Sequence, residues 1–312
     1  MKRQSRPLFQ KTLLALTMAL SVSSLADACT RAVYQGDGSL VAAGFDAGTA
    51  DGMNEKGLVA NLLYLTESEY VTPSDKDARK TLSISLWAQY VLDNFATVSE
   101  AVAALSKDEF YVVTTLTPDG KPGQLHLSIS DASGDSAIFQ YVDGKLQIHH
   151  DRSYQVMTNS PVFDKQLALN EYWEEIGGLT MLPGTNRSAD RFARASFYIK
   201  TLPKTDQANE AVAGVMSVMR NVSVPMGIST PDQPNISTTL WRSVSDQQHR
   251  RYFFELTHLP NTFWVSMDQL DLSAGAPVKK LPLTERQLYA GETADKFVPA
   301  KAFTFLPATP GA

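Results

Sequence analysis

Alternating apolar and polar positions predict β-strands through much of the first half of the chain. These strand segments are residues 39–45, 57–65, 109–116, 124–130, 136–142, 145–149 and 154–158. Turn sequences separate them, among them Pro118-Asp-Gly120 and Asp143-Gly144. Closely spaced strands joined by short turns indicate antiparallel hairpins.

Apolar residues at three- and four-residue spacing predict helices, and further strands follow them. The helices cover residues 82–95, 98–105, 163–176, 188–202 and 207–221, and Thr97 with Glu100 has the spacing of a capping box. The later strands are expected at residues 239–245, 252–256 and 262–267. Strands, then helices, then strands, with few βαβ units, predict an α+β fold in which helices cover two stacked antiparallel sheets. The sequence has no internal repeat and no linker-like stretch, so we expect one domain.

Composition narrows the chemistry that this chain can support. Its 312 residues include a single cysteine, which excludes an intrachain disulfide, a cysteine-rich zinc site and an iron–sulfur cluster. The net charge of -5, with no basic run beyond the first dozen residues, argues against a nucleic-acid partner. No nucleotide-binding or Gly-x-Ser-x-Gly motif occurs. We expect neither a metal nor a cofactor, because ligand spacing is missing from the five histidines, His126, His149, His150, His249 and His258.

The first 28 residues have the pattern of an export signal. Four basic side chains precede an apolar run at residues 12–20, and Ala26-Asp27-Ala28 is a small-x-small cleavage sequence. The apolar run is shorter than the roughly 20 residues that span a bilayer. The sequence therefore predicts that residues 1–28 form a signal peptide and that residues 29–312 are periplasmic or secreted, without a membrane anchor.

Cleavage after Ala28 makes Cys29 the first residue of the mature chain. Cys29 is alternatively the lipid-modified residue of a lipoprotein, or an ordinary strand residue behind a different cleavage site. Ala26 and Asp27 depart from the usual lipoprotein signal, which favours a free N-terminal thiol. Such a residue is a complete nucleophile–base pair, because its thiol attacks a carbonyl carbon while its α-amine, with an ordinary pKa of roughly 7.7–8.0, takes the thiol proton.

Four ordered motifs resemble those of the choloylglycine hydrolase family. They are Cys-Thr-Arg-Ala-Val-Tyr at 29–34, Asp-Gly-Met-Asn-Glu-Lys-Gly-Leu at 51–58, Val-Met-Thr-Asn-Ser-Pro at 156–161 with Phe-Asp at 163–164, and Leu-Pro-Gly-Thr at 182–185 with Asp-Arg-Phe at 190–192. That family of linear amide C–N hydrolases includes penicillin V acylases and bile salt hydrolases, and the export signal is similar to its Gram-negative penicillin V acylase branch. The resemblance implies a four-layer αββα N-terminal nucleophile hydrolase fold.

The resemblance also implies roles for individual residues. Cys29 is the nucleophile with its own amine as base, Asn159 holds the oxyanion and the amine, Arg191 supports the charge network, and Tyr64 contributes to the oxyanion hole. The residues by themselves also fit simpler interpretations: Asn159 as a turn residue, Arg191 as a helix-surface ion pair and Tyr64 as part of the core.

One segment departs from the family pattern. Relatives carry an Arg-x-Met-Asp-Trp stretch between the N-terminal cysteine and the Asp-Gly-Met-Asn motif, whereas residues 39–48 run almost directly into that motif and contain neither Arg nor Trp. Asp46 is the one candidate for the missing catalytic aspartate. Either Asp46 takes its place or the whole hairpin is deleted, and the unbroken run from Gly44 into the next motif favours the deletion. A deletion predicts a weakened or inactive enzyme, or an incomplete sequence.

The function predicted from these observations is an exported N-terminal cysteine amidohydrolase. It cleaves the linear amide of an apolar N-acyl substrate through an S-acyl enzyme, with penicillin V as the first expected substrate, N-acyl homoserine lactones as the second and conjugated bile acids as the third. A catalytically impaired periplasmic binding or structural relative is the alternative, and a lipoprotein anchored through Cys29 is a weaker one. The resemblance implies a homotetramer.

Overall fold

The computed structural model describes most of the chain after the expected signal peptide. The described residues are 29–32, 43–45, 48–72, 79–107, 109–116, 120–226, 238–283, 287–302 and 304–310. Residues 1–28, which carry the expected export signal, and Asp46, the candidate catalytic aspartate, lie outside the described residues.

The larger sheet has six antiparallel strands. Their order is β2 (Ala43–Phe45), β3 (Gly48–Met53), β4 (Val59–Tyr64), β7 (Leu125–Ser130), β8 (Ser136–Val142) and β9 (Lys145–His150). The sequence pattern predicted each of these except β3. That strand reads Gly-Thr-Ala-Asp-Gly-Met and has no apolar alternation, so its strand conformation follows from pairing with β4, where Asp51 lies opposite Asn61.

The smaller sheet contains β11 (Trp241–Asp246), β12 (Arg251–Leu256), β13 (Thr262–Ser266) and β15 (Gly291–Glu292). The first three form the predicted antiparallel meander, whereas β15 joins β13 in parallel. A second parallel pair joins β5 (Lys80–Ser83) to β6 (Phe110–Val113). Both parallel pairs correct the expectation of purely antiparallel sheets. The chain crosses over through two helices between β5 and β6, which lets both strands run the same way.

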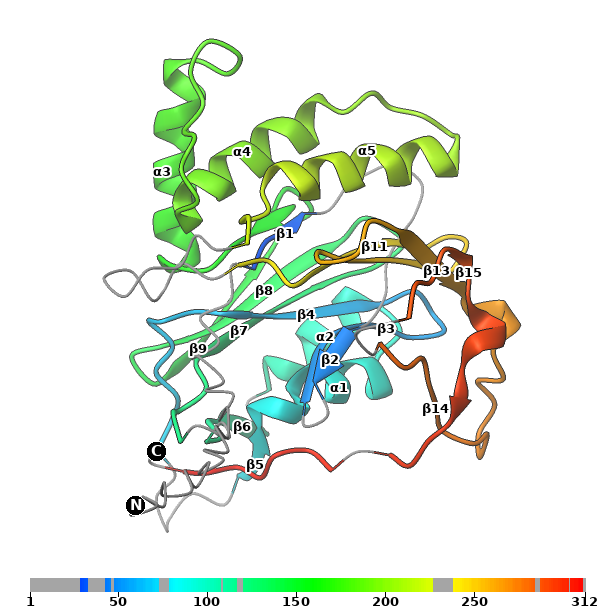
Figure 1. The fold of residues 1–312 in the computed structure, drawn as a ribbon. Helices are drawn as coiled ribbons and strands as arrows, with labels where there is room; N and C mark the ends of the chain where they lie inside the picture. Colours follow the sequence, from blue (N-terminus) through cyan, green and yellow to red (C-terminus); the bar gives the residue numbers. More distant parts are fainter. Residues whose placement is uncertain are drawn as a thin grey trace, which may run out of the picture.

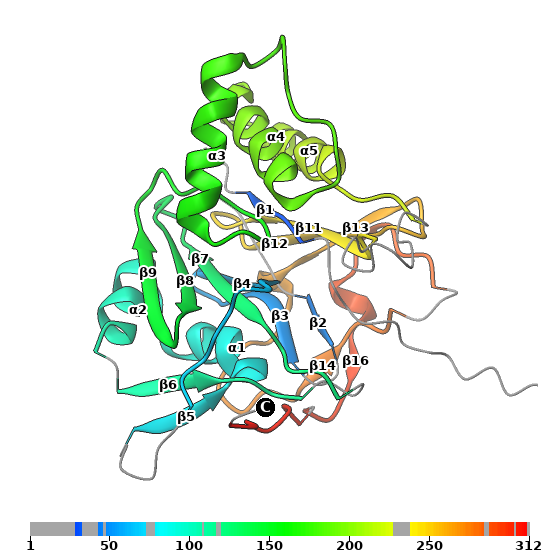
Figure 2. The same ribbon diagram turned by 90° about the vertical axis from the view of Figure 1, so that its left-hand side faces the viewer.

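Helices cover the outer faces of the two stacked sheets (Figures 1 and 2). The larger sheet is covered by α1 (Ile84–Asn94) and α2 (Val98–Leu105), and the smaller by α4 (Ser188–Thr201) and α5 (Ala208–Asn221), with α3 (Phe163–Ile176) beside α4. The capping box of Thr97 and Glu100 is present at the start of α2. The four-layer α+β architecture is therefore confirmed.

Two further pairs of short strands lie outside the two main sheets. Arg31–Ala32 forms β1 and pairs with β10 (Val156–Met157), while β14 (Lys279–Lys280) pairs with β16 (Val298–Pro299). The β1–β10 pair borders the core between the sheets and α4 and α5, where Met157, Phe192 and Phe253 are buried. Cys29 packs half-buried at the edge of this core. Its side chain thus sits where the protein interior meets solvent.

Acid is expected to destabilise the fold through His126. This residue of β7 is fully buried beside Gln140, with Nδ1 2.8 Å from Nε2, and burial lowers its pKa to about 3. The unfolded chain, whose histidine pKa is about 6.5, binds the proton more strongly, so this contribution to stability is complete above that pH and is lost as the pH falls toward 3. We expect urea unfolding to report a loss on the order of 1 kcal/mol per pH unit across this window.

The matched variant for this prediction is His126→Gln. A glutamine side chain keeps a hydrogen-bonding group toward Gln140 but takes up no proton. The free energy of unfolding of this variant should fall less steeply between pH 6.5 and 4 than that of the unsubstituted protein. Equal slopes would assign the acid sensitivity to other groups.

Candidate active site

The short pair of β1 with β10 brings Cys29 to Asn159, although 130 residues separate them in the sequence. The backbone N–H of Cys29 donates to Oδ1 of Asn159 at 3.1 Å. This nitrogen is the atom that becomes the α-amine if the chain is cleaved after Ala28. The candidate base is therefore held by one buried amide side chain, and it belongs to the same residue as the candidate nucleophile.

Hydrogen bonds on all sides fix the orientation of the Asn159 amide. Its Oδ1 accepts from Cys29 N and from Nη2 of Arg191 at 2.7 Å, and its Nδ2 donates to the carbonyl oxygen of Tyr64 at 2.8 Å. The backbone is held as well, because Gln166 Nε2 donates to the carbonyl oxygens of Asn159 and of Pro161, the latter at 2.9 Å. Asn159 is thus a convergence point of four chain segments rather than only a turn residue.

Arg191 lies in the first turn of α4 and is 2% exposed. Its guanidinium donates to the Cys29 carbonyl oxygen at 2.5 Å, to the hydroxyl of Thr30, to Asn159 Oδ1 and to the Asn186 carbonyl oxygen at 3.1 Å. Burial lowers the pKa of Arg191 to about 10, attraction to Cys29 opposes this shift, and repulsion from Arg194 adds to it. Arg191 therefore stays charged at neutral pH, and its charge stabilises the thiolate form of Cys29.

Tyr64 enters the site through its backbone. It is the last residue of β4, and its carbonyl oxygen accepts the bond from Asn159 Nδ2. Its hydroxyl instead donates to Gln124 Oε1 at 3.2 Å. Of the five predicted site residues, the structure brings together Cys29, Asn159, Arg191 and the Tyr64 backbone, and Asp46 is outside the described residues.

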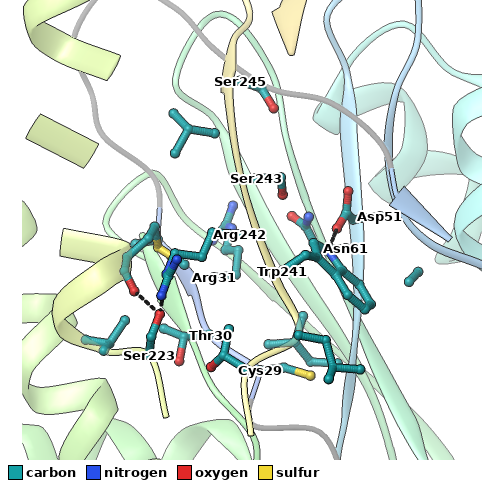
Figure 3. A pocket seen from close by; sticks show the side chains of 18 of the residues that line it. Cys29, Thr30, Arg31, Asp51, Asn61, Ser223, Trp241, Arg242, Ser243 and Ser245 are labelled. Carbon is teal, nitrogen blue, oxygen red and sulfur yellow. Dashed lines mark hydrogen bonds between the residues drawn. The ribbon is translucent and has the colours of Figure 1, made fainter. Parts of the chain in front are cut away.

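A cavity of about 140 Å³ adjoins Cys29 between the two sheets (Figure 3). Polar side chains of β3, β4 and β11 line one part of it, namely Asp51, Asn61, Ser243 and Ser245, together with Trp241 and Arg242. Trp241 Nε1 and the hydroxyl of Tyr252 each lie 3.4 Å from a carboxylate oxygen of Asp51. The sequence motifs did not predict four further residues of this site: Thr30, Gln166, Trp241 and Arg242. Only Gln166 had a local signal, as a polar residue on the buried side of a predicted helix.

The described ranges were searched for metal-binding clusters and for membrane-spanning helices. They contain no group of three or more His, Cys, Asp or Glu side chains placed to hold a metal ion. Within the same ranges, no helix has both the length and the apolar character needed to cross a bilayer.

Two stacked sheets between helices, with a half-buried thiol beside a buried amide and guanidinium, define an N-terminal nucleophile hydrolase fold. Residues 35–280 match the linear amide C-N hydrolases, choloylglycine hydrolase family. The chain belongs to this family, whose penicillin V acylases and bile salt hydrolases act on non-peptide C–N bonds in linear amides.

Similar proteins support this assignment at two levels. A penicillin V acylase of Pectobacterium atrosepticum is 48% identical over an alignment of 289 positions, and the alignment covers 86% of this chain and 77% of that protein. The structure of penicillin V acylase from Agrobacterium tumefaciens is 55% identical, with a TM-score of 0.78 over 88% of this chain and 84% of the other. A mutant of conjugated bile acid hydrolase from Clostridium perfringens, 22% identical with a TM-score of 0.64 over 79% and 86% of the two chains, shares the fold.

The alignment with the Pectobacterium protein bears on the deletion that is predicted before Asp51. Its 289 aligned positions exceed 86% of the 312 residues of this chain, so some positions of that relative have no counterpart here. A deleted hairpin before Asp51 would leave such a gap. The deletion itself stays a prediction, because residues 33–42, 46 and 47 lie outside the described residues.

Proposed function

We propose that this protein is an exported N-terminal cysteine amidohydrolase that cleaves N-acyl amides with an apolar acyl group, penicillin V first among them. The observation that carries the proposal is the hydrogen-bond network that joins Cys29 N, Asn159 and Arg191. The two penicillin V acylases at 48% and 55% identity support the choice of substrate.

The proposed reaction needs no group beyond this chain and water. The α-amine of Cys29 takes the thiol proton, and the sulfur attacks the amide carbonyl carbon to form a C–S bond. The negative oxygen that develops accepts hydrogen bonds from neutral donors, for which Asn159 Nδ2 is the candidate side chain. The C–N bond then breaks, the leaving amine takes the proton, and water hydrolyses the thioester to release the acid and restore the thiol.

The hydrogen-bond network can supply part of the function expected of the hairpin that is predicted to be deleted. Asn159 Oδ1 orients the Cys29 nitrogen, and the Arg191 charge, placed beside an α-amine, favours the unprotonated form that accepts the thiol proton. An enzyme with a reduced rate is therefore the expected consequence of the shortened segment. The alternative is a periplasmic binding protein of the same fold that has lost catalysis.

Export and self-association extend the proposal. A signal peptide at residues 1–28 delivers the chain to the periplasm or the medium and exposes Cys29 as the first residue. Self-association into the homotetramer is supported by exposed apolar side chains on and after α3, among them Tyr172, Leu179 and Met181.

Intact-mass spectrometry of the exported protein tests the proposal directly. We expect a mass that begins at Cys29, and a transient phenoxyacetyl adduct when penicillin V is added and the reaction is quenched in acid. Phenoxyacetate release should be measured in parallel. A lipidated Cys29 or a different first residue would exclude the mechanism. A free Cys29 with neither adduct nor product would favour the binding protein.

A further inference from the structure

The described lining of the cavity beside Cys29 carries an excess of positive charge. Among the described residues, three charged side chains line it: Arg31 and Arg242 are arginines, and Asp51 is a carboxylate. Asp51 lies on the wall shared with Trp241 and Tyr252, whose N–H and O–H groups face its two oxygens. Figure 3 shows Arg242 and Arg31 on the opposite side of the cavity from Asp51.

Arg242 shares its counter-ion with a second arginine. Glu255 Oε2 lies 3.1 Å from Arg242 Nη1 and 3.2 Å from Arg220 Nε, and its other oxygen accepts from Arg220 Nη2 and from Thr262. Burial raises the pKa of Glu255, but these hydrogen bonds and the two guanidinium charges outweigh burial and lower it overall. Glu255 therefore neutralises the charge of Arg242 only in part, because Arg220 binds the same carboxylate from outside the cavity lining.

Two of the three nitrogens of the Arg242 guanidinium make hydrogen bonds. Its Nε donates to Ser223 Oγ at 2.7 Å and its Nη1 to Glu255, whereas Nη2 has no hydrogen-bond partner among the described residues. The Arg242 side chain is 20% exposed and lines the cavity. A fixed guanidinium with an open edge matches the geometry of a carboxylate or sulfonate.

Arg31 adds a second cation with no carboxylate bound to it in the described part of the chain. It is 5% exposed and donates to the carbonyl oxygens of Tyr154 and Ile129 and to the Ser136 hydroxyl, while its Nε has no partner there. Burial lowers its pKa to about 9, so it too stays charged at neutral pH. The hydroxyl of Ser245, 1% exposed on the same cavity, likewise has no partner within the described residues.

From these contacts we propose that the cavity contains an anion subsite, centred on Arg242, which binds an acidic group on the amine half of the substrate. The inference rests on the proposed function. An apolar acyl group carries no charge. An anion that binds Arg242 therefore belongs to the amine half of the substrate, which leaves when the acyl group is transferred to Cys29. The subsite selects N-acyl amino acids and other acidic amides, penicillin V and conjugated bile acids included, over uncharged N-acyl homoserine lactones.

A matched pair of substrates tests the subsite. N-phenoxyacetylglycine carries a carboxylate on its amine half, and N-phenoxyacetylglycinamide replaces it with a neutral amide of nearly the same shape. We expect kcat/KM of the unsubstituted protein to favour the acid by about 10- to 100-fold, the range for a hydrogen bond to a charged group. Equal values for the two compounds would overturn the inference without any variant.

Arg242→Gln should remove most of this preference for the acid. Glu255 keeps Arg220 and Thr262 in this variant, so no buried carboxylate is left without a partner. Arg220→Gln is the matched control, because it removes the other arginine from the same carboxylate but does not line the cavity. The control should keep the preference for the acid. A preference that survives in Arg242→Gln would overturn the inference.

Two further measurements separate the subsite from the proposed function. If neither compound is hydrolysed and no adduct forms on Cys29, the proposed function fails. Titration calorimetry of the two compounds then still tests the anion subsite. Tighter binding of the acid than of the amide, lost in Arg242→Gln, would support the subsite. Equal binding of the two compounds would overturn it. If Arg242→Gln does not fold, Arg242→Lys retains the cation and should keep part of the preference.

Discussion

Replacing Cys29 with alanine is expected to lower the rate of penicillin V hydrolysis by more than about a thousandfold, because the variant has no nucleophile to form the S-acyl enzyme. The fold should persist, since the side chain is half-buried at the edge of the core. Phenoxyacetate release and intact mass, measured on a variant whose thermal midpoint matches the unsubstituted protein, check this expectation.

Because the chain has a single cysteine, Cys29→Ala is a direct control for the acyl adduct. No other thiol exists in the chain, so any acyl adduct on sulfur must disappear in Cys29→Ala. Cys29→Ser retains a hydroxyl and should show only trace turnover, since an alcohol in this place is a weaker nucleophile than a thiolate. Equal product release from all three proteins would leave this residue without a catalytic role.

Replacing Arg191 with glutamine is expected to lower both activity and stability. The shorter neutral side chain cannot bridge the Cys29 carbonyl, the Thr30 hydroxyl and Asn159 Oδ1, so buried acceptors lose their partner and the Cys29 backbone loses an anchor. Loss of such bonds to a charged group costs about 2–5 kcal/mol in the free energy of unfolding. We expect kcat/KM to fall by about 100- to 1000-fold, because the Asn159 amide is no longer held beside the nucleophile.

Arg194→Gln is the control for the Arg191 variant. Arg194 lies one turn further along α4 and donates to the carbonyl oxygens of Pro183 and Thr185, not to Cys29 or Asn159. Its removal should destabilise the connection before α4 while kcat/KM of the folded protein changes little. Urea unfolding with active-site titration separates the two effects. A similar loss of kcat/KM in both variants would mean that Arg191 has only a structural role.

Local sequence patterns were sufficient for the helices and for most strands. The helix at residues 98–105 and the helix at residues 163–176 have the bounds that their apolar spacing predicts, because such spacing records directly which face of a helix is buried. The strand β3 was missed for the converse reason. Its two glycines and its aspartate carry no apolar alternation, and its neighbours in the sheet hold it.

The candidate nucleophile and its partners were predicted from motifs, but their contacts were not. Cys29, Asn159 and Arg191 lie in separate segments, and bonds across 130 and 162 residues depend on how β1, β10 and α4 pack together. The sequence also did not predict the direction in which the Tyr64 hydroxyl points. It depends on Gln124, which lies at the edge of the neighbouring strand.

By itself, the sequence determined the α+β class, the helices and the family to which the chain belongs, and it predicted Cys29, Asn159 and Arg191 as candidate site residues. The tertiary structure alone decided that Arg191 is buried against Cys29 and that Arg242 faces the same cavity while sharing Glu255 with Arg220. The physical reason is that burial and net charge at a site are sums over distant segments. No single window of sequence contains them.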